Sequence, residues 1–500
     1  MGGVAMLTLT GLGSQLVGFL YRVLLTRMAG AEVLGLYQMI LPIYGVLTAF
    51  TAGGLTTGVS NLSARYCALG NRRAVGQLRG QAVLLFLLLA VGPCLLLGGW
   101  SDRIAVLVLG EARTRLGLRL LAPCLVLTGI ENLHKHYFYG VGHVAPAAVT
   151  EFLEQVLRSG LCLGCLAVLQ PKTAEGSVGA VVLGMALCES AAAVTQWFLF
   201  RWDMGPAKMR EGPGQKGGVL RRQLGQIAAP LGLAAVLGSL LSSANALLIP
   251  RLLVRGGMEQ GRAVAAYGVV FGMALPMLLV PTAFLSALCL VLTPSVARSA
   301  AVGDREGVRV STERAAVAAN LVLVPSLALL SALGPALGQA LSGTHEVGEL
   351  LPLLSLGVLF SCWHGLFSGV LNGAGKQKTA TGIALACDGF QLALTIASVS
   401  RWGLAGYAFS FALSSLLGAA WAWRAVSQET GARLSLYRFL AAPGLSAALA
   451  ASGGGLMETA LLRSGLEGLP SALGGIGFGF LLYIAAMDAL GVRFPGISMG

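Results

Sequence analysis

Apolar runs long enough to cross a membrane recur from one end of this 500-residue chain to the other. A transmembrane helix needs about 20 consecutive apolar residues. Only 11% of the residues are charged, against about 25% in soluble domains. The sequence therefore predicts an all-α polytopic membrane protein with about 14 transmembrane helices, roughly at 4–25, 36–62, 80–100, 117–138, 146–169, 178–200, 226–250, 265–293, 315–338, 350–372, 379–400, 403–423, 437–457 and 470–490.

Lysine and arginine are distributed unevenly between the connections of these spans. An even number of spans puts both termini on one side of the membrane. If that side is the cytoplasm, its connections hold 21 of the 34 basic residues, Lys135 included, and the opposite connections hold 11. Because basic residues gather in cytoplasmic loops, we expect a multi-pass protein of the cytoplasmic membrane with both termini inside. The same bias accounts for the net charge of +13, so we expect no nucleic-acid partner.

The chain contains an internal repeat. ARYCALGNRRAV at 64 matches ARSAAVGDREGV at 297, and YGVGH at 139 matches NGAGK at 372, both at an offset of 233 residues. Each half holds six spans, so the halves share one topology and a pseudo-twofold axis along the membrane normal. We therefore expect an N-terminal six-helix bundle, a basic Gly-rich cytoplasmic linker, a C-terminal six-helix bundle and two additional transmembrane helices, at 1–200, 201–223, 224–425 and 426–500.

Several segments carry a family resemblance. They are GFLYRVLLTRMAGAEVLGLYQMILP at 18–42, YGVGHVAPAAVTEFLEQVLR at 139–158, 265–301 and LNGAGKQKTA at 371–380. The chain resembles the MOP flippase superfamily with its MATE-like fold, and within it the stage V sporulation protein B and polysaccharide biosynthesis exporter branch. The resemblance implies two six-helix bundles in a V around a central cavity, and alternating access. It also implies translocation of a lipid-linked glycan precursor, for spore cortex peptidoglycan in the sporulation members. Lipid II flippases of the superfamily carry arginine in the second span. The same span of this chain reads LPIYGVLTAFTAGG and has no arginine, so the resemblance does not extend to lipid II as the substrate.

One helical stripe of the fifth span is charged. Glu151, Glu154 and Arg158 are spaced i, i+3 and i+7. Arg158 lies about 12 residues into the span, roughly 18 Å deep at 1.5 Å per residue. A charge there costs at least ~2.5 kcal/mol if it faces lipid. Two interpretations stay open. The stripe lines a cavity, where Arg158 contacts a pyrophosphate and a carboxylate carries a coupling proton or sodium ion, or Glu154 and Arg158 form an ion pair that joins two helices.

Other polar residues of the spans extend this candidate set. At the repeat offset of 233, Gln155 corresponds to Asp388 and Arg158 to Gln391, so the matching span of the second half is polar at the same depth. Further cavity candidates, with interfacial anchoring as the alternative, are Arg22, Arg27 and Arg255. Arg22 and Arg255 are again 233 residues apart, which suggests two cations holding one anionic headgroup.

No motif indicates an enzyme, a metal site or a cofactor. His134 and His136 lack metal-ligand spacing, and we interpret them as interfacial anchors. GVLNGAGKQK fails the phosphate-loop spacing, which argues against nucleotide binding and direct ATP drive. We expect a flippase whose partners are a lipid-linked glycan precursor and membrane lipids. The alternatives are a cation-coupled MATE-type small-molecule exporter, which needs an acidic, aromatic-lined cavity, and a non-transporting scaffold for glycan-synthesis enzymes.

Overall fold

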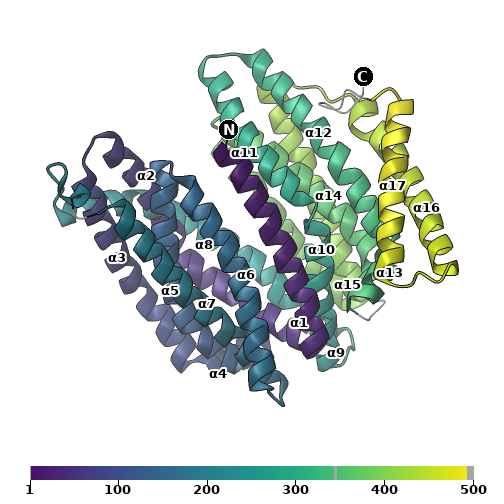
Figure 1. The fold of residues 1–500 in the computed structure, drawn as a ribbon, viewed down its shortest axis with the longest axis horizontal. Coiled ribbons are helices and arrows are strands. Elements are labelled where there is room, and N and C mark those ends of the chain that lie inside the picture. Colours follow the sequence, from purple (N-terminus) through teal and green to yellow (C-terminus); the bar gives the residue numbers. More distant parts are fainter. Residues whose placement is uncertain (1, 206, 343–345, 493–500) are drawn as a thin grey trace. The chain divides into compact units, whose positions relative to one another are not determined.

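The computed structural model describes residues 2–205, 207–342 and 346–492 (Figure 1). These residues are almost entirely helical and include no β-strand. Packing divides the chain into two compact units. The boundary along the chain falls between Arg251 and Leu252, inside one helix. The sequence analysis placed a linker between the two halves at 201–223 because of the internal repeat. The boundary at Arg251 is instead defined by which helices pack together.

Unit 1 extends to Arg251 and holds the first eight α-helices. They are α1 (Gly2–Thr48), α2 (Gly54–Ala68), α3 (Arg72–Gly99), α4 (Ser101–Arg103), α5 (Arg115–Val141), α6 (Val144–Leu169), α7 (Ala174–Asp203) and α8 (Gly217–Arg255). A π-helical turn, Ala49–Gly53, joins α1 to α2, and a second, Ile104–Leu109, follows α4.

Unit 2 begins at Leu252 and holds the remaining helices. They are α9 (Gln260–Tyr267), α10 (Leu275–Leu279), α11 (Thr282–Ala301), α12 (Arg305–Ala332), α13 (Gly334–Ser342), α14 (Glu346–Gly373), α15 (Gln377–Thr430), α16 (Ala442–Arg463) and α17 (Leu469–Ala489). π-helical turns at Gly268–Ala274 and Tyr437–Ala441 precede α10 and α16.

Thirteen described helical segments are long and apolar enough to cross a membrane. Two of them contain two spans each, because their helices break at Gly30 (φ 87°) and Gly403 (φ 58°), where glycine tolerates a positive φ. Conversely, Gln260–Leu279 and Thr282–Ala300 follow each other directly through helical backbone at Pro281, so we count them as one bent span. The prediction of an all-α membrane fold with about fourteen spans is therefore confirmed.

Small residues allow close helix packing within each unit. A Cβ added to Gly54 of α2 would lie 2.0 Å from the Ala228 carbonyl oxygen of α8. In unit 2, a Cβ on Gly475 of α17 would lie 2.7 Å from the Gly454 carbonyl oxygen of α16. Such contacts bring backbones together in a bilayer, where the hydrophobic effect does not drive helices to associate.

A buried asparagine attaches the last two helices to the rest of unit 2. The Asn320 side chain of α12 donates to the Phe439 carbonyl (2.6 Å) and accepts from the Trp363 indole N–H of α14 (2.6 Å). Phe439 lies in the π-helical turn before α16, where the regular helix bonding of the backbone is interrupted. Asn320 thus provides a hydrogen bond to this carbonyl and joins three helical segments.

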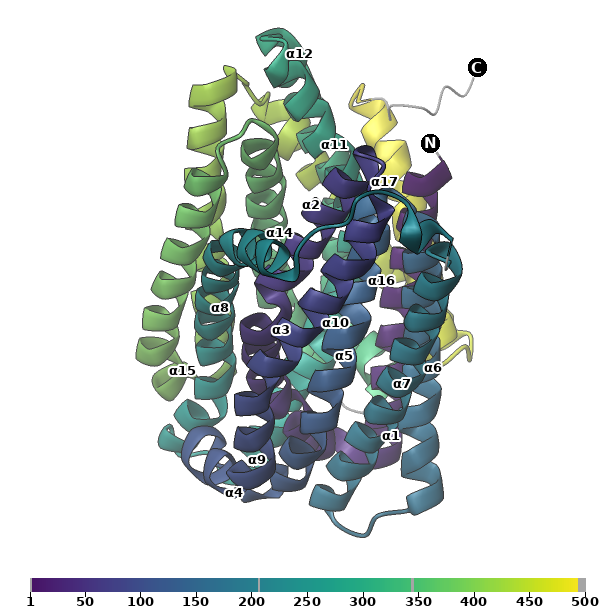
Figure 2. The same ribbon diagram turned by 90° about the vertical axis from the view of Figure 1, so that its left-hand side faces the viewer.

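The connection between α7 and α8 is held against unit 1 (Figure 2). Asn71 begins α3 by accepting from the Ala74 N–H, and its oxygen also accepts from the Gly214 N–H at 3.1 Å. The Tyr66 hydroxyl donates to the Gln223 side chain at 2.6 Å. The basic segment predicted as a linker therefore runs along the turn between α2 and α3.

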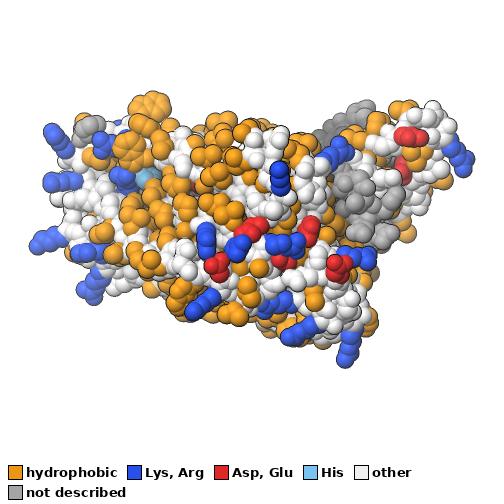
Figure 3. Space-filling view, turned by 90° about the horizontal axis from the view of Figure 1, so that it is seen from below, with side chains coloured by type: hydrophobic (Ala, Val, Ile, Leu, Met, Phe, Trp, Pro, Cys, Tyr) orange, Lys and Arg blue, Asp and Glu red, His pale blue; other side chains and the backbone are white. Residues whose placement is uncertain are grey.

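Ion pairs cover the end of unit 1 that carries α4 and the α6–α7 connection. Arg113 pairs with Glu32 (2.6 Å), Arg115 with Glu175 (2.7 Å) and Arg119 with Asp102 (2.9 Å). Figure 3 shows acidic and basic side chains side by side in the middle of the face seen from below, whereas its left edge carries basic side chains alone. Arg113, Arg115 and Arg119 are thus each offset by a carboxylate.

Candidate functional site

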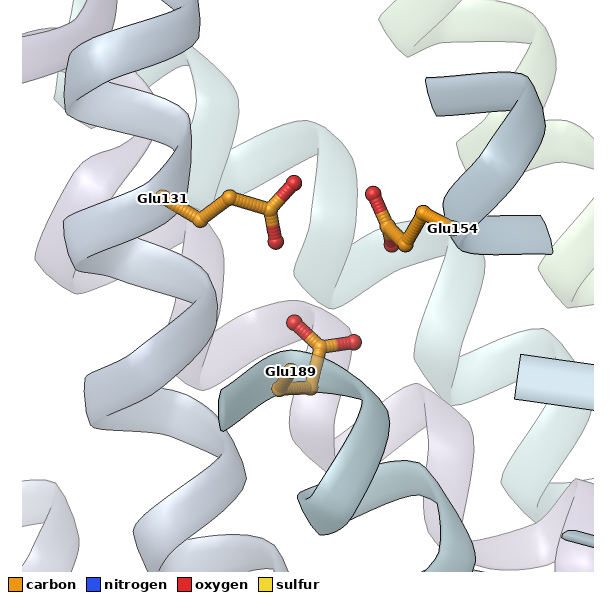
Figure 4. Close-up of side chains that lie close together, drawn as sticks. All are labelled: Glu131, Glu154 and Glu189. Atoms are coloured by element: carbon orange, nitrogen blue, oxygen red, sulfur yellow. The ribbon is translucent and has the colours of Figure 1, made fainter. Parts of the chain in front are cut away.

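Five charged side chains meet inside the membrane-spanning part of unit 1. Glu131 and Lys135 come from α5, Glu154 and Arg158 from α6, and Glu189 from α7. Glu131 is 1% exposed and Glu189 is fully buried. Figure 4 shows the three glutamates pointing toward one another from three helices. We call these five residues the charge network.

Close packing of α6 on α7 brings the network together. A Cβ added to Gly184 of α7 would lie 2.5 Å from the Cα of Cys162 on α6. Gly184 precedes Glu189 by just over one turn, and Cys162 follows Arg158 by one turn, so the close approach places these two charges opposite each other. Gly142, with a left-handed backbone (φ 80°), ends α5 and lets the chain turn into α6. Because α6 runs back along α5, Glu154 lies beside Lys135.

Positive and negative groups alternate through the network. The Lys135 Nζ lies 2.5 Å from Glu131 Oε1 and 2.7 Å from Glu154 Oε2. Arg158 Nη2 pairs with Glu154 Oε1 and lies 2.6 Å from Glu189 Oε1. Each cation thus bridges two carboxylates, an arrangement that offsets part of the large cost of removing these charges from water.

Two hydroxyl groups extend the network toward α1. The Thr128 hydroxyl of α5 donates to Glu189 Oε2. The Tyr44 hydroxyl of α1 donates to the Thr128 oxygen at 2.6 Å. Tyr44 is only partly buried, so these hydrogen bonds connect a buried carboxylate with a side chain nearer the surface of unit 1.

The charges of the network do not balance when every group is ionised. Three carboxylates face two cations, which leaves one negative charge in excess. Three carboxylate oxygens, one from each glutamate, lie within 4.8 Å of one another. Because Lys135 and Arg158 already bridge these oxygens, the donor set is that of an ion-pair network, and one proton or one monovalent cation would balance its charge.

The sequence predicted only part of this site. Glu154 and Arg158 form the ion pair that was one of the two interpretations left open. Lys135, which the sequence analysis placed in a cytoplasmic connection, instead lies inside α5 and is 8% exposed, because α5 continues to Val141. Glu131 and Glu189 were missed, although a carboxylate inside an apolar span is itself a signal. Glu131 and Lys135 also have the i, i+4 spacing of a helical ion pair.

Two further predicted candidates on α6, Glu151 of the stripe and its neighbour Gln155, lie outside the network. Glu151 is exposed and accepts a 3.3 Å hydrogen bond from the Tyr139 hydroxyl. Gln155 faces α1, because a Cβ on Gly18 would lie 3.1 Å from its Nε2. Polar side chains of α6 therefore face both α7, through Arg158, and α1, through Gln155.

Arg22 and Arg27 lie on α1. Arg22 is partly buried, and within the described part of the chain its guanidinium forms no ion pair. Arg27 is exposed. Arg22 is thus a cation inside a membrane span, and no described carboxylate neutralises its charge.

The candidates of the second half lie in unit 2. Asp388 and Gln391 are partly buried and lie on one face of α15, three residues apart. Arg255 is exposed at the end of α8. A shared headgroup between Arg22 and Arg255 stays a prediction.

His134 has both ring nitrogens occupied by neighbouring groups. The Arg79 Nε donates to its Nε2 at 2.9 Å, and its Nδ1 lies 2.7 Å from the Ile130 carbonyl oxygen. The ring is 1% exposed, so the expected interfacial anchoring is wrong for His134. It packs inside unit 1 because α5 extends past it.

Comparison with known proteins agrees with the class that the fold defines, a multi-pass helical membrane protein. Residues 1–299 match the family model described as polysaccharide biosynthesis protein, and residues 253–397 match the MatE model. The chain belongs to the polysaccharide biosynthesis protein family. Stage V sporulation protein B of Bacillus subtilis (strain 168) is 24% identical over 297 residues, which cover 59% of this chain and 57% of that protein.

Solved structures of low sequence identity share the fold. Lipid II flippase MurJ in an inward closed conformation matches with a TM-score of 0.74 at 12% identity, covering 97% of this chain and 98% of that one. A multidrug resistance MATE family transporter in an inward-facing conformation matches with a TM-score of 0.69 at 14% identity, covering 83% of this chain and 96% of that one.

Proposed function

We propose that this protein is a flippase that translocates a polyprenyl-linked glycan or peptidoglycan precursor across the cytoplasmic membrane by alternating access. Membership of the polysaccharide biosynthesis family supports the substrate class. The likeness to a lipid II flippase over nearly the whole chain, α16 and α17 included, supports the same class. The relative named for stage V sporulation supports spore cortex synthesis as the process served.

The observation that carries the proposal is Arg22. A cation inside a membrane span is costly unless it faces water or an anion. No described carboxylate pairs with Arg22, so the charge is available to a substrate anion. Arginine suits a diphosphate because its planar fork donates two parallel hydrogen bonds. In the proposed mechanism, Arg22 binds the diphosphate while the polyprenyl tail remains in the bilayer.

The charge network supplies the coupling step of the proposal. Its excess negative charge takes up one proton or one sodium ion, and the Tyr44 and Thr128 hydroxyls lead to Glu189. Uptake and release of that cation change the net charge held between α5, α6 and α7. A change of this kind biases a two-state transporter toward one of its conformations.

The direct test is translocation in proteoliposomes, with a fluorescent polyprenyl-pyrophosphate glycan and a membrane-impermeant quencher. Arg22→Gln should slow translocation roughly 10- to 100-fold, the range expected for one lost charge-assisted hydrogen-bonding partner. Arg103→Gln, at an exposed arginine of unit 1, is the matched control and should leave the rate unchanged. Equal rates for wild type and a well-folded Arg22→Gln protein would refute the role of Arg22.

A second candidate is a cation-coupled exporter of small molecules, favoured by the MatE match over 253–397. Export of a fluorescent cationic dye by the same vesicles, with no translocation of any glycan lipid, would select this candidate. A protein that transports neither would fit the scaffold alternative, in which glycan-synthesis enzymes are the partners.

A further inference from the structure

A cavity of about 860 Å³ lies at one end of unit 2, apart from the charge network. It is enclosed by α11, the first half of α12, the connection after α15 and the end of α17. Figure 1 shows the start of α12 and the end of α17 at the same, upper end of unit 2. Much of its wall is apolar, formed by Leu288, Val291, Leu292, Val310 and Val317.

Three arginines line the same cavity. Arg314, Arg433 and Arg438 are exposed, and within the described part of the chain none of them forms an ion pair. The one carboxylate among the lining residues is Glu313. It accepts the backbone N–H of Arg433 at 2.8 Å and lies 3.8 Å from the Arg309 guanidinium. The cavity therefore carries excess positive charge beside an apolar wall.

The position along the helices places this cavity at a membrane surface. Arg314 lies nine residues into α12, about 14 Å from the start of the helix. Near the cavity, Leu436 and Tyr437 are exposed, and the Tyr437 hydroxyl donates to the Leu490 carbonyl at 2.9 Å. Exposed aromatic residues of this kind concentrate at headgroup level. The contact also joins the turn before α16 to the end of α17, next to the lining residues Arg438 and Gly491.

We propose that this cavity binds one anionic phospholipid of the bilayer. The lipid phosphate lies among Arg314, Arg433 and Arg438, and the upper part of an acyl chain follows the apolar wall of α11 and α12. A soluble anion would use the arginines and leave the wall uncovered, whereas a phospholipid complements both. Basic pockets between transmembrane helices at a membrane surface are typical of such recognition. This site is independent of the proposed transport function.

The test measures lipid binding to the full-length protein in detergent, by native mass spectrometry and by titration with fluorescent phosphatidylglycerol. Phosphatidylcholine with the same acyl chains is the uncharged comparison and should bind far more weakly. Replacing Arg314 or Arg438 by glutamine should weaken phosphatidylglycerol binding about fivefold each, and the double variant about 25-fold. Arg463→Gln, at the other end of α16, is the matched control and should bind like wild type.

Four results would overturn the proposal. These are equal binding by the folded double variant and wild type, equal loss in Arg463→Gln, equal affinity for the two phospholipids, and displacement of phosphatidylglycerol by soluble glycerol phosphate, which would show a simple anion site. Tighter binding of a polyprenyl phosphate than of phosphatidylglycerol would assign the cavity to the transported lipid and would also overturn it. Arg314→Lys keeps the charge, so recovery of binding in this variant separates lost charge from misfolding.

Discussion

Replacing Arg158 by glutamine removes the cation that bridges two buried carboxylates. Glu154 keeps Lys135 as a partner, but Glu189 keeps, among the residues that the structure describes, only the Thr128 hydroxyl. Breaking a buried ion pair by removing one partner costs about 3–5 kcal/mol. Because the Arg158 side chain is 26% exposed while Glu189 is fully buried, we expect a loss near 3 kcal/mol in the free energy of unfolding of unit 1.

A second substitution tests whether the unpaired charge of Glu189 causes this loss in the free energy of unfolding. Glu189→Gln alone leaves Arg158 paired with Glu154 and should cost about 1–3 kcal/mol, because its polar contacts weaken. In the double variant no uncompensated charge remains at position 189. The two effects should therefore fall short of additivity by about 1–2 kcal/mol, the coupling expected for residues in contact.

The assay is reversible unfolding of the purified protein in mixed micelles, with the midpoint followed by circular dichroism. Arg103→Gln is the matched control, because it removes the same side chain from an exposed position of unit 1 where, among the described residues, no ion pair is lost. It should change stability by less than about 0.5 kcal/mol. A wild-type midpoint for Arg158→Gln, or strict additivity in the double variant, would refute the reasoning that the network holds α6 and α7 together.

Three further predictions concern packing. Asn320→Leu should cost about 2–3 kcal/mol in unfolding free energy, because the buried Phe439 carbonyl loses its donor; an unchanged midpoint would show that water replaces the asparagine. Gly54→Val should prevent a normal fold of unit 1, since its Cβ would lie 2.0 Å from the Ala228 oxygen; size-exclusion chromatography should show aggregation, and a monodisperse, fully active variant would contradict the close approach. Asn71→Ala should cost about 1 kcal/mol as a lost helix cap and should speed proteolysis of the α7–α8 connection, whereas wild-type protease resistance would show that other contacts hold it.

Local sequence properties determined most of the fold. The length of the apolar runs sets the number and position of the spans, because an unpaired backbone group is so costly in lipid that each run must become a helix. The break at Gly30 falls between two spans that hydropathy already separates, and the break at Gly403 falls at the first residue of the span predicted at 403–423. The ion pair between Glu154 and Arg158 could also be predicted from the sequence, because residues four apart on one helix are neighbours.

The sequence by itself thus determined the membrane-spanning helices, the repeat and the ion pair within α6. Only the tertiary structure decided that Glu131, Lys135 and Glu189 join this pair, since that requires three helices to pack at one height and rotation. Their approach depends on the contact at Gly184, which involves residues far apart in the chain. The same holds for the cavity of unit 2, where Arg314 lies near Arg433 and Arg438 although more than a hundred residues separate them. Helical periodicity fixes neighbours within one helix, whereas neighbours on different helices are fixed only by how their side chains pack.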